Sequence, residues 1–287
     1  MKKVEEMQER AAKKHKQEDQ DNEEESDGSL EADFLFNDPC TEDRDGILAI
    51  IQGCLKKVPW EPTKDCTDTT YGILAQLIAE QMNLGTLIKN DDNDAYVLAV
   101  LSILNIKMYE DLKALSDVFI ALTKQHGSRQ DLETMTKILG EERNQIGLLV
   151  NERLGNIPTQ LIGNLHQCVY DDLQWSLENA DDEDELRFYK FTHLVGMGRV
   201  FTDNSKNLEA ENMVFVKPEE RFYFKEAVVK FMWNTGESNK IDFYEDNDES
   251  KPAKTKVLPE AMMLYCIPIN KYKGIVRRIA ETFAQTA

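Results

Sequence analysis

The sequence QIGLLVNERLGNIPTQLIGNLHQCVYDDLQWSL, residues 145–177, decides the fold of this chain. It begins with a short apolar run at residues 146–150, which is typical of a buried strand. A polar connector that contains a glycine follows at residues 151–157. Pro158 then suits the first turn of a helix, because its ring fixes φ and its missing N–H is not needed there. A buried strand that leads into a helix through a short turn indicates an α/β fold.

Residues 158–177 predict a long amphipathic helix. Apolar side chains recur every four residues along it, and Ile162 widens the stripe that they form. The recurring residues are Leu161, Leu165, Val169, Leu173 and Leu177. A helix with one apolar stripe buries that stripe against a sheet, so we place this strand and helix at the centre of the protein.

Other apolar segments predict the rest of the fold. Predicted strands cover residues 32–36, 84–89, 96–106, 186–201, 213–216, 227–233 and 262–269. Predicted helices cover residues 45–58, 69–82, 108–124, 130–139 and 269–283. The run at 96–106 is predicted as a central strand, although periodicity alone also allows a buried helix. Because helices and strands mix before several consecutive strands, we expect one mixed β-sheet flanked by helices.

Residues 1–32 predict a disordered, charged tail before an α/β domain at residues 33–287. The tail is almost wholly polar, and residues 18–31 are acidic. Such a segment buries too little apolar surface to offset the entropy cost of ordering it. The basic run KKHK at residues 13–16 has two interpretations, a nuclear-import signal or charge that keeps the chain soluble.

The charge of the chain restricts its partners. Its formal net charge is −19 over 287 residues, which repels nucleic acid and anionic membranes, so we expect neither as a direct partner. A basic protein partner is favoured instead. The five cysteines are scattered, which fits reduced thiols in the cytosol or nucleus. We expect no secretory signal and no membrane span, since no apolar run approaches the roughly 20 residues that spanning requires.

The sequence carries no recognisable catalytic or metal-binding motif. None of the four histidines stands in a metal-ligand spacing, and His166 is predicted as a packing or surface residue on the long helix. Neither a G-x-S-x-G elbow nor a phosphate-binding loop of the G-x-x-x-x-G-K-[ST] type occurs. We therefore predict a protein that is not an enzyme and holds no metal or cofactor.

One glycine-containing run leaves an alternative open. Residues 193–198 read HLVGMG, which is similar to the pyrophosphate-binding turn R/Q-x-x-G-x-G/A of acetyl-CoA-dependent N-acetyltransferases. His193 replaces the Arg or Gln, and the sequence after the run does not predict a helix. The favoured interpretation is that Gly196 and Gly198 permit a bend or bulge in a strand. We assign no cofactor site here.

Two groups of charged residues are candidate partner-binding sites. Asp181, Asp182, Glu183, Asp184 and Glu185 form a predicted acidic loop, and a second acidic loop is predicted at residues 242–249. Such loops are either solvated turns or parts of a surface that shields a basic protein.

The second group follows the central strand, where Glu152 and Arg153 lie at the sheet edge that often carries ligand sites in α/β folds. The simpler interpretation is a local ion pair that holds the connector in place.

The chain resembles the BCCIP family, whose fungal members are nuclear proteins. The core of the resemblance is GLLVNERLGNIPTQL at residues 147–161, where Glu152, Arg153, Asn156, Pro158 and Gln160 match the family pattern. Looser matches run in order from Phe34 to Phe283, at residues 34–47, 77–91 and 215–231 and in the segment LPEAMMLYCIPINKYKGIV. The resemblance implies an α/β fold similar to the acetyltransferase (GNAT-like) fold, in a family considered non-enzymatic.

The resemblance also implies a function. Fungal members look like nuclear chaperones for a basic large-subunit ribosomal protein, which supports 60S ribosome biogenesis, and they are linked to nuclear export of a phosphatidylinositol phosphate 5-kinase. We therefore expect a nuclear carrier that shuttles to the cytoplasm. The alternatives are an export adaptor for such a lipid kinase or, less favoured, an acetyl-CoA-dependent N-acetyltransferase. The recombination and cell-cycle partners of animal members are not carried over.

Overall fold

The structure is a computed structural model that describes residues 33–52, 58, 60, 70–81, 83–90, 96–202, 213–243 and 254–284. Asp33–Ala287 forms one compact unit. The predicted tail at residues 1–32 lies outside the described residues, as does most of the predicted acidic loop at 242–249.

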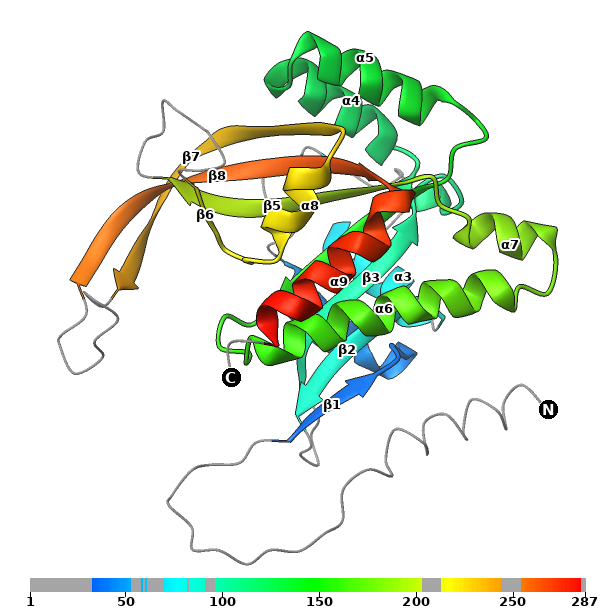
Figure 1. Cartoon of the computed structure of the whole chain (residues 1–287), viewed down its shortest axis with the longest axis horizontal. Coiled ribbons are helices and arrows are strands. Elements are labelled where there is room, and N and C mark those ends of the chain that lie inside the picture. Colours follow the sequence, from blue (N-terminus) through cyan, green and yellow to red (C-terminus); the bar gives the residue numbers. More distant parts are fainter. Residues whose placement is uncertain are drawn as a thin grey trace, which may run out of the picture. The chain divides into compact units, whose positions relative to one another are not determined.

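A mixed eight-stranded sheet forms the middle layer of this domain (Figure 1), with the order β1-β2-β3-β4-β5-β8-β7 and β6 paired to β5 off this path. The strands are β1 (Phe34–Asn37), β2 (Gly85–Asn90), β3 (Val97–Asn105), β4 (Ile146–Arg153), β5 (His193–Thr202), β6 (Met213–Phe215), β7 (Val229–Phe243) and β8 (Lys254–Pro268). Among these pairings only β4 and β5 run parallel. A parallel pair needs a long crossover, and the helix after β4 supplies it.

Helices cover both faces of the sheet. They are α2 (Arg44–Ile51), α3 (Thr70–Glu80), α4 (Leu115–His126), α5 (Arg129–Gly140), α6 (Gln160–Glu178), α7 (Glu183–Tyr189), α8 (Glu220–Glu226) and α9 (Tyr272–Phe283). One apolar cluster joins α2, α3, α4 and α5 to the sheet, and the other joins α6, α8 and α9 to its opposite face. Helices α6 and α9 cross this second face next to each other (Figure 1). No helix in the described part of the chain has the length and apolar character to cross a membrane.

The predicted strand at residues 96–106 is confirmed, and β3 shows why its sequence is continuously apolar. Val100 and Leu104 belong to the cluster on one face of the sheet, whereas Leu101 and Ile103 belong to the cluster on the other. A strand covered on both faces has no polar side, so alternation disappears.

The central strand and helix are confirmed, with a correction between them. Helix α6 begins at Gln160, just after Pro158, and its apolar stripe is buried against the sheet. The residues predicted as connector at 151–153 instead continue β4, because they pair with Ala99, Val100 and Leu101 of β3. The strand therefore carries Glu152 and Arg153 within the sheet, and the connector itself is shorter than predicted.

The prediction of an acidic loop at residues 181–185 is wrong, because these residues form the start of helix α7. Asp182 is the N-cap, and its side chain accepts a hydrogen bond from the Glu185 N–H at 2.8 Å. The Glu185 carboxylate accepts in turn from the Asp181 N–H at 2.6 Å. Acidic side chains stabilise the first turn of a helix, whose free N–H groups carry partial positive charge. The strand predicted from residue 186 accordingly begins only at His193.

Candidate functional site

The parallel strands β4 and β5 separate after four paired residues. Residues 146–149 of β4 pair with 193–196 of β5, and beyond this point β6 pairs with β5 instead. The opening past the carboxyl ends of such strands is where α/β folds commonly bind ligands. In this chain residues 213–220, which we call the bridging segment, connect the two separated strands through contacts with both.

Lys217 of the bridging segment forms buried ion pairs with two carboxylates. Its Nζ donates to Glu152 Oε1 at 2.7 Å and lies 3.1 Å from Glu220 Oε1. It also donates to the backbone carbonyl of Asn151. Burial opposes a charge on Lys217, but the two carboxylates outweigh this effect and raise its pKa. The ammonium group therefore stays charged inside the protein.

Arg153 makes the second connection. Its guanidinium donates to both carboxylate oxygens of Glu219, with Nη2 at 3.0 Å from Oε2, and Asn151 Nδ2 donates to Glu219 Oε1 at 3.0 Å. Burial raises the pKa of Glu219, but the charge and hydrogen bonds of Arg153 lower it further than burial raises it.

These contacts correct the expected local ion pair, because Glu152 and Arg153 pair with the bridging segment and not with each other. Their side chains are nearly buried, so in this structure both residues hold the bridging segment on β4.

The two glycines of HLVGMG serve close packing. They lie inside β5, which continues to Thr202, so no helix begins at either glycine. A Cβ at Gly196 would lie 2.3 Å from the Tyr265 ring, and a Cβ at Gly198 would lie 2.2 Å from Glu220 Oε2. The run therefore forms no turn at a helix N-terminus, and it does not fit the pyrophosphate of acetyl-CoA. The glycines are strand residues as expected, but they form no bulge, because β5 pairs with β8 in unbroken register from His193 to Phe201.

Glu220 is predicted to make stability depend on pH. Burial raises its pKa to about 8 against the lowering effect of Lys217. The folded state then holds the proton of Glu220 more tightly than the unfolded state does. The stability that this proton contributes is therefore complete below about pH 4.5 and is lost as pH rises through about 8. Compared with a Glu220→Gln variant, the wild type should lose stability over that range in urea unfolding. As a control, Glu133→Gln changes an exposed residue and should leave the dependence of stability on pH as it is in the wild type. If stability changes with pH in the same way in Glu220→Gln and in the wild type, the pH dependence does not come from Glu220.

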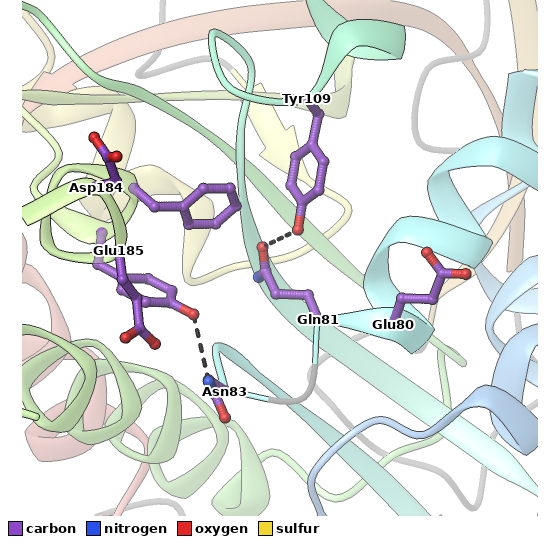
Figure 2. A pocket seen from close by; sticks show the side chains of 8 residues that line it. Glu80, Gln81, Asn83, Tyr109, Asp184 and Glu185 are labelled. Atoms are coloured by element: carbon purple, nitrogen blue, oxygen red, sulfur yellow. Dashed lines mark hydrogen bonds between the residues drawn. The ribbon is translucent and has the colours of Figure 1, made fainter. Parts of the chain in front are cut away.

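A surface pocket of about 340 Å³ contains two of the predicted partner-binding residues, Asp184 and Glu185. We call it the acidic pocket. Its lining comes from the end of α3 and the turn after it, from Tyr109, and from α7. The lining residues are Glu80, Gln81, Asn83, Tyr109, Asp184, Glu185, Phe188 and Tyr189. Figure 2 shows Glu80 on one side of the pocket and Asp184 and Glu185 on the other.

Three aromatic rings form the wall of the acidic pocket. Tyr109 and Phe188 pack edge to face with centroids 5.2 Å apart, and Phe188 and Tyr189 do so at the same separation. The Tyr109 hydroxyl donates to Gln81 Oε1 at 2.9 Å. The Gln81 amide donates to two backbone carbonyls, and Asn83 donates to the Tyr189 hydroxyl (Figure 2). These bonds fix the two hydroxyls, so the wall is ordered before any ligand arrives.

Carboxylates around aromatic rings favour a positively charged ligand. The faces of aromatic rings attract cations, and carboxylates add direct charge attraction. The size of the pocket suits a side chain such as that of lysine or arginine. No group of His, Cys, Asp and Glu side chains in the described residues has the arrangement to hold a metal ion.

Sequence reasoning found only part of this site. Asp181, Asp182 and Glu183 do not line the pocket and lie at the start of α7 beside it. Glu80, Tyr109, Phe188 and Tyr189 were missed, because no local pattern brings the segment after β3 to α7. The aromatic residues 188 and 189 were assigned to a strand, which hid their position four residues after Asp184 and Glu185 on one helix.

A sequence profile of the BCCIP family matches residues 29–256, which is most of the chain. The chain belongs to the BCCIP family. Protein bcp1 of Schizosaccharomyces pombe is 24% identical over 279 residues, which cover 89% of this chain and 91% of that protein. The BCCIP homolog of Arabidopsis thaliana is 27% identical over 227 residues, covering 75% of this chain and 66% of that relative.

BCCIP-family likeness extends to an animal protein and to a solved structure. The Bos taurus protein named "BRCA2 and CDKN1A-interacting protein" is 22% identical over 263 residues, covering 83% of this chain and 79% of that one. The crystal structure of BCP1 from Saccharomyces cerevisiae matches with a TM-score of 0.56 and 19% identity, over 92% of this chain and 97% of that chain. At this identity the structural match establishes a shared fold, and the expected α/β fold with one mixed sheet is confirmed.

Proposed function

We propose that this chain is a nuclear carrier and chaperone for a basic protein of the large ribosomal subunit, supporting 60S biogenesis and nuclear export. The observation that carries the proposal is the acidic pocket, where Glu80, Asp184 and Glu185 surround an ordered aromatic wall. A lysine or arginine side chain of the client enters this pocket. Asp181, Asp182 and Glu183 extend the acidic surface along the start of α7.

Several observations support binding rather than catalysis. The net charge of −19 suits a partner whose basic surface is destined for ribosomal RNA, because covering that surface prevents aggregation until delivery. The name of the bovine relative describes a protein that interacts with other proteins. Glu152 and Arg153 act in this proposal through the bridging segment, which they hold against the sheet.

Affinity capture tests the proposal. The full chain, immobilised and exposed to nuclear extract at low salt, should retain a basic large-subunit ribosomal protein. Mass spectrometry of the eluate identifies the client. Recovery of no ribosomal protein under these conditions would refute the carrier function, and recovery of a lipid kinase in its place would support the export-adaptor alternative.

Binding of the client is predicted to weaken as salt rises. The carboxylates Glu80 and Asp184 are exposed at the pocket, and exposed charge pairs are screened over about 10 Å at 0.1 M ionic strength. Affinity measured by calorimetry between low and high salt should therefore fall steadily. A complex that is equally tight at all salt concentrations would indicate an apolar interface and contradict this mode of binding.

The acetyltransferase alternative requires the protein to bind acetyl-CoA, which titration calorimetry can measure. The bridging segment is held on β4 by buried ion pairs and on β5 by the pairing of β6, and Gly196 and Gly198 are covered by Tyr265 and Glu220. We therefore expect no heat of binding when acetyl-CoA is titrated into the protein. Saturable binding would restore the enzyme hypothesis.

A further inference from the structure

A second pocket of about 370 Å³ lies beside the acidic pocket and carries the opposite charge. We call it the basic pocket. Three of its lining residues are cations, in a chain whose net charge is −19. Its lining residues are Ile106, Lys107, Met108, Lys113, Ser116, Leu139, Gly140, Glu142, Gln145 and Arg187.

Arg187 is the most informative of these residues. It follows Glu183 and Asp184 by four and three positions on α7, the spacings at which a helix allows ion pairs. Yet its side chain forms no hydrogen bond or ion pair with any residue in the described ranges, and Arg187 lines the basic pocket instead. An unpaired guanidinium that turns to a pocket is suited to bind an anion.

The other two cations, Lys113 and Lys107, already contact other residues of the chain. Lys113 pairs with Glu110 in an exposed ion pair. Lys107 donates to the backbone carbonyl of Glu141 at 2.6 Å, and burial lowers its pKa although Glu141 and Glu142 oppose that effect. Glu141 pairs with Arg143 and does not line the pocket. Among the lining residues, Lys107 and Arg187 therefore face the single carboxylate of Glu142, and one carboxylate from outside would balance the remaining positive charge.

The two pockets share a wall. Met108 and Arg187 line the basic pocket, whereas the next residues in sequence, Tyr109 and Phe188, line the acidic pocket. The contact of the Tyr109 and Phe188 rings, with centroids 5.2 Å apart, separates them. A single bound segment can therefore reach both pockets with neighbouring side chains.

We propose that the basic pocket binds the carboxylate of an aspartate or glutamate in the same client segment whose basic side chain enters the acidic pocket. This inference rests on the proposed carrier function. It specifies a docking segment that carries both signs of charge, rather than a purely basic one. Ile106 and Leu139 supply the apolar lining of the pocket, and the charge of Lys107 and Arg187 selects the carboxylate.

Peptide titration of the full chain tests the inference. The probes are labelled synthetic peptides with one lysine and one glutamate, separated by one to six glycine or serine residues. Matched peptides replace the glutamate with glutamine or with phosphoserine. At the best spacing the glutamate peptide should bind about fivefold more tightly than the glutamine peptide, which is the upper range for an accessible ion pair. Fluorescence anisotropy measures each Kd.

Two variants locate the effect. The advantage of glutamate should disappear in Arg187→Gln and persist in Lys190→Gln, because Lys190 is exposed just after α7 and lines neither pocket. The inference would be overturned if the glutamate peptide bound no more tightly than the glutamine peptide at any spacing. It would also be overturned if Arg187→Gln kept the full difference between these two peptides, or if only the phosphoserine peptide bound. Capture of a ribosomal protein by the wild type tests the carrier function separately, so that function stands if only the peptide titration fails.

Discussion

Replacing Lys217 with methionine is expected to lower the free energy of unfolding by about 3–5 kcal/mol. Lys217 is 5% exposed, pairs with the Glu152 carboxylate and lies beside Glu220, which with a pKa of about 8 is mostly protonated near neutral pH. Methionine fills similar space but leaves the buried Glu152 carboxylate without its partner, which is far more costly than losing an exposed pair. Urea unfolding near neutral pH, followed by circular dichroism, measures the difference.

The exposed ion pair of Lys113 and Glu110 provides the matched control. Lys113→Met should change stability by less than about 0.5 kcal/mol, since surface ion pairs contribute little. A loss below about 1 kcal/mol for Lys217→Met would contradict the assignment of the bridging segment as a buried support, because it would place these charges in contact with water.

Reversing two charges of the acidic pocket is expected to weaken client binding by tenfold or more. In a Glu80→Lys and Asp184→Lys double variant, the client's basic side chain meets two cations, and like charges brought together at an interface cost about several kcal/mol. Both residues are exposed and lie away from the buried ion pairs, so the fold should be retained. Calorimetry with the captured client measures the affinity, and circular dichroism checks the fold.

A second double variant with the same change in charge controls for net charge. Asp117→Lys and Glu178→Lys also alter two exposed acids, one of them in the first turn of a helix like Asp184, but neither residue lines the pocket or belongs to the acidic start of α7. This variant should bind the client more tightly than the pocket variant by about tenfold. Equal losses in the two variants would show that only overall charge matters, and the acidic pocket would then have no specific role.

Local patterns predicted most of the fold. The apolar stripe of α6 follows from spacing along one helix, and β3 follows from a run rich in Val and Leu that is covered on both faces. The end of β4 was missed because Asn151, Glu152 and Arg153 are polar, and polar residues usually mark a connector. They are buried only because Lys217 and Glu219, distant in sequence, supply the matching charges.

The candidate site was only partly predictable for a related reason. The acids of α7 were recognised by composition, but their roles as cap and first turn of a helix were not, since acidic runs also occur in loops. Glu80 and Tyr109 reach the pocket through the packing of segments far apart in sequence. No spacing rule connects them with Asp184, so the pocket became visible only in the folded chain.

Zero-length cross-linking of the captured complex is the most direct test of the carrier proposal. A carbodiimide joins lysine amines to carboxylates that touch them, and mass spectrometry locates each linked pair. The account predicts links from a basic large-subunit ribosomal protein to Glu80, Asp184 or Glu185, which are lost in the pocket variant. A captured partner that is not a basic ribosomal protein, or links confined to acids elsewhere on the chain, would contradict it.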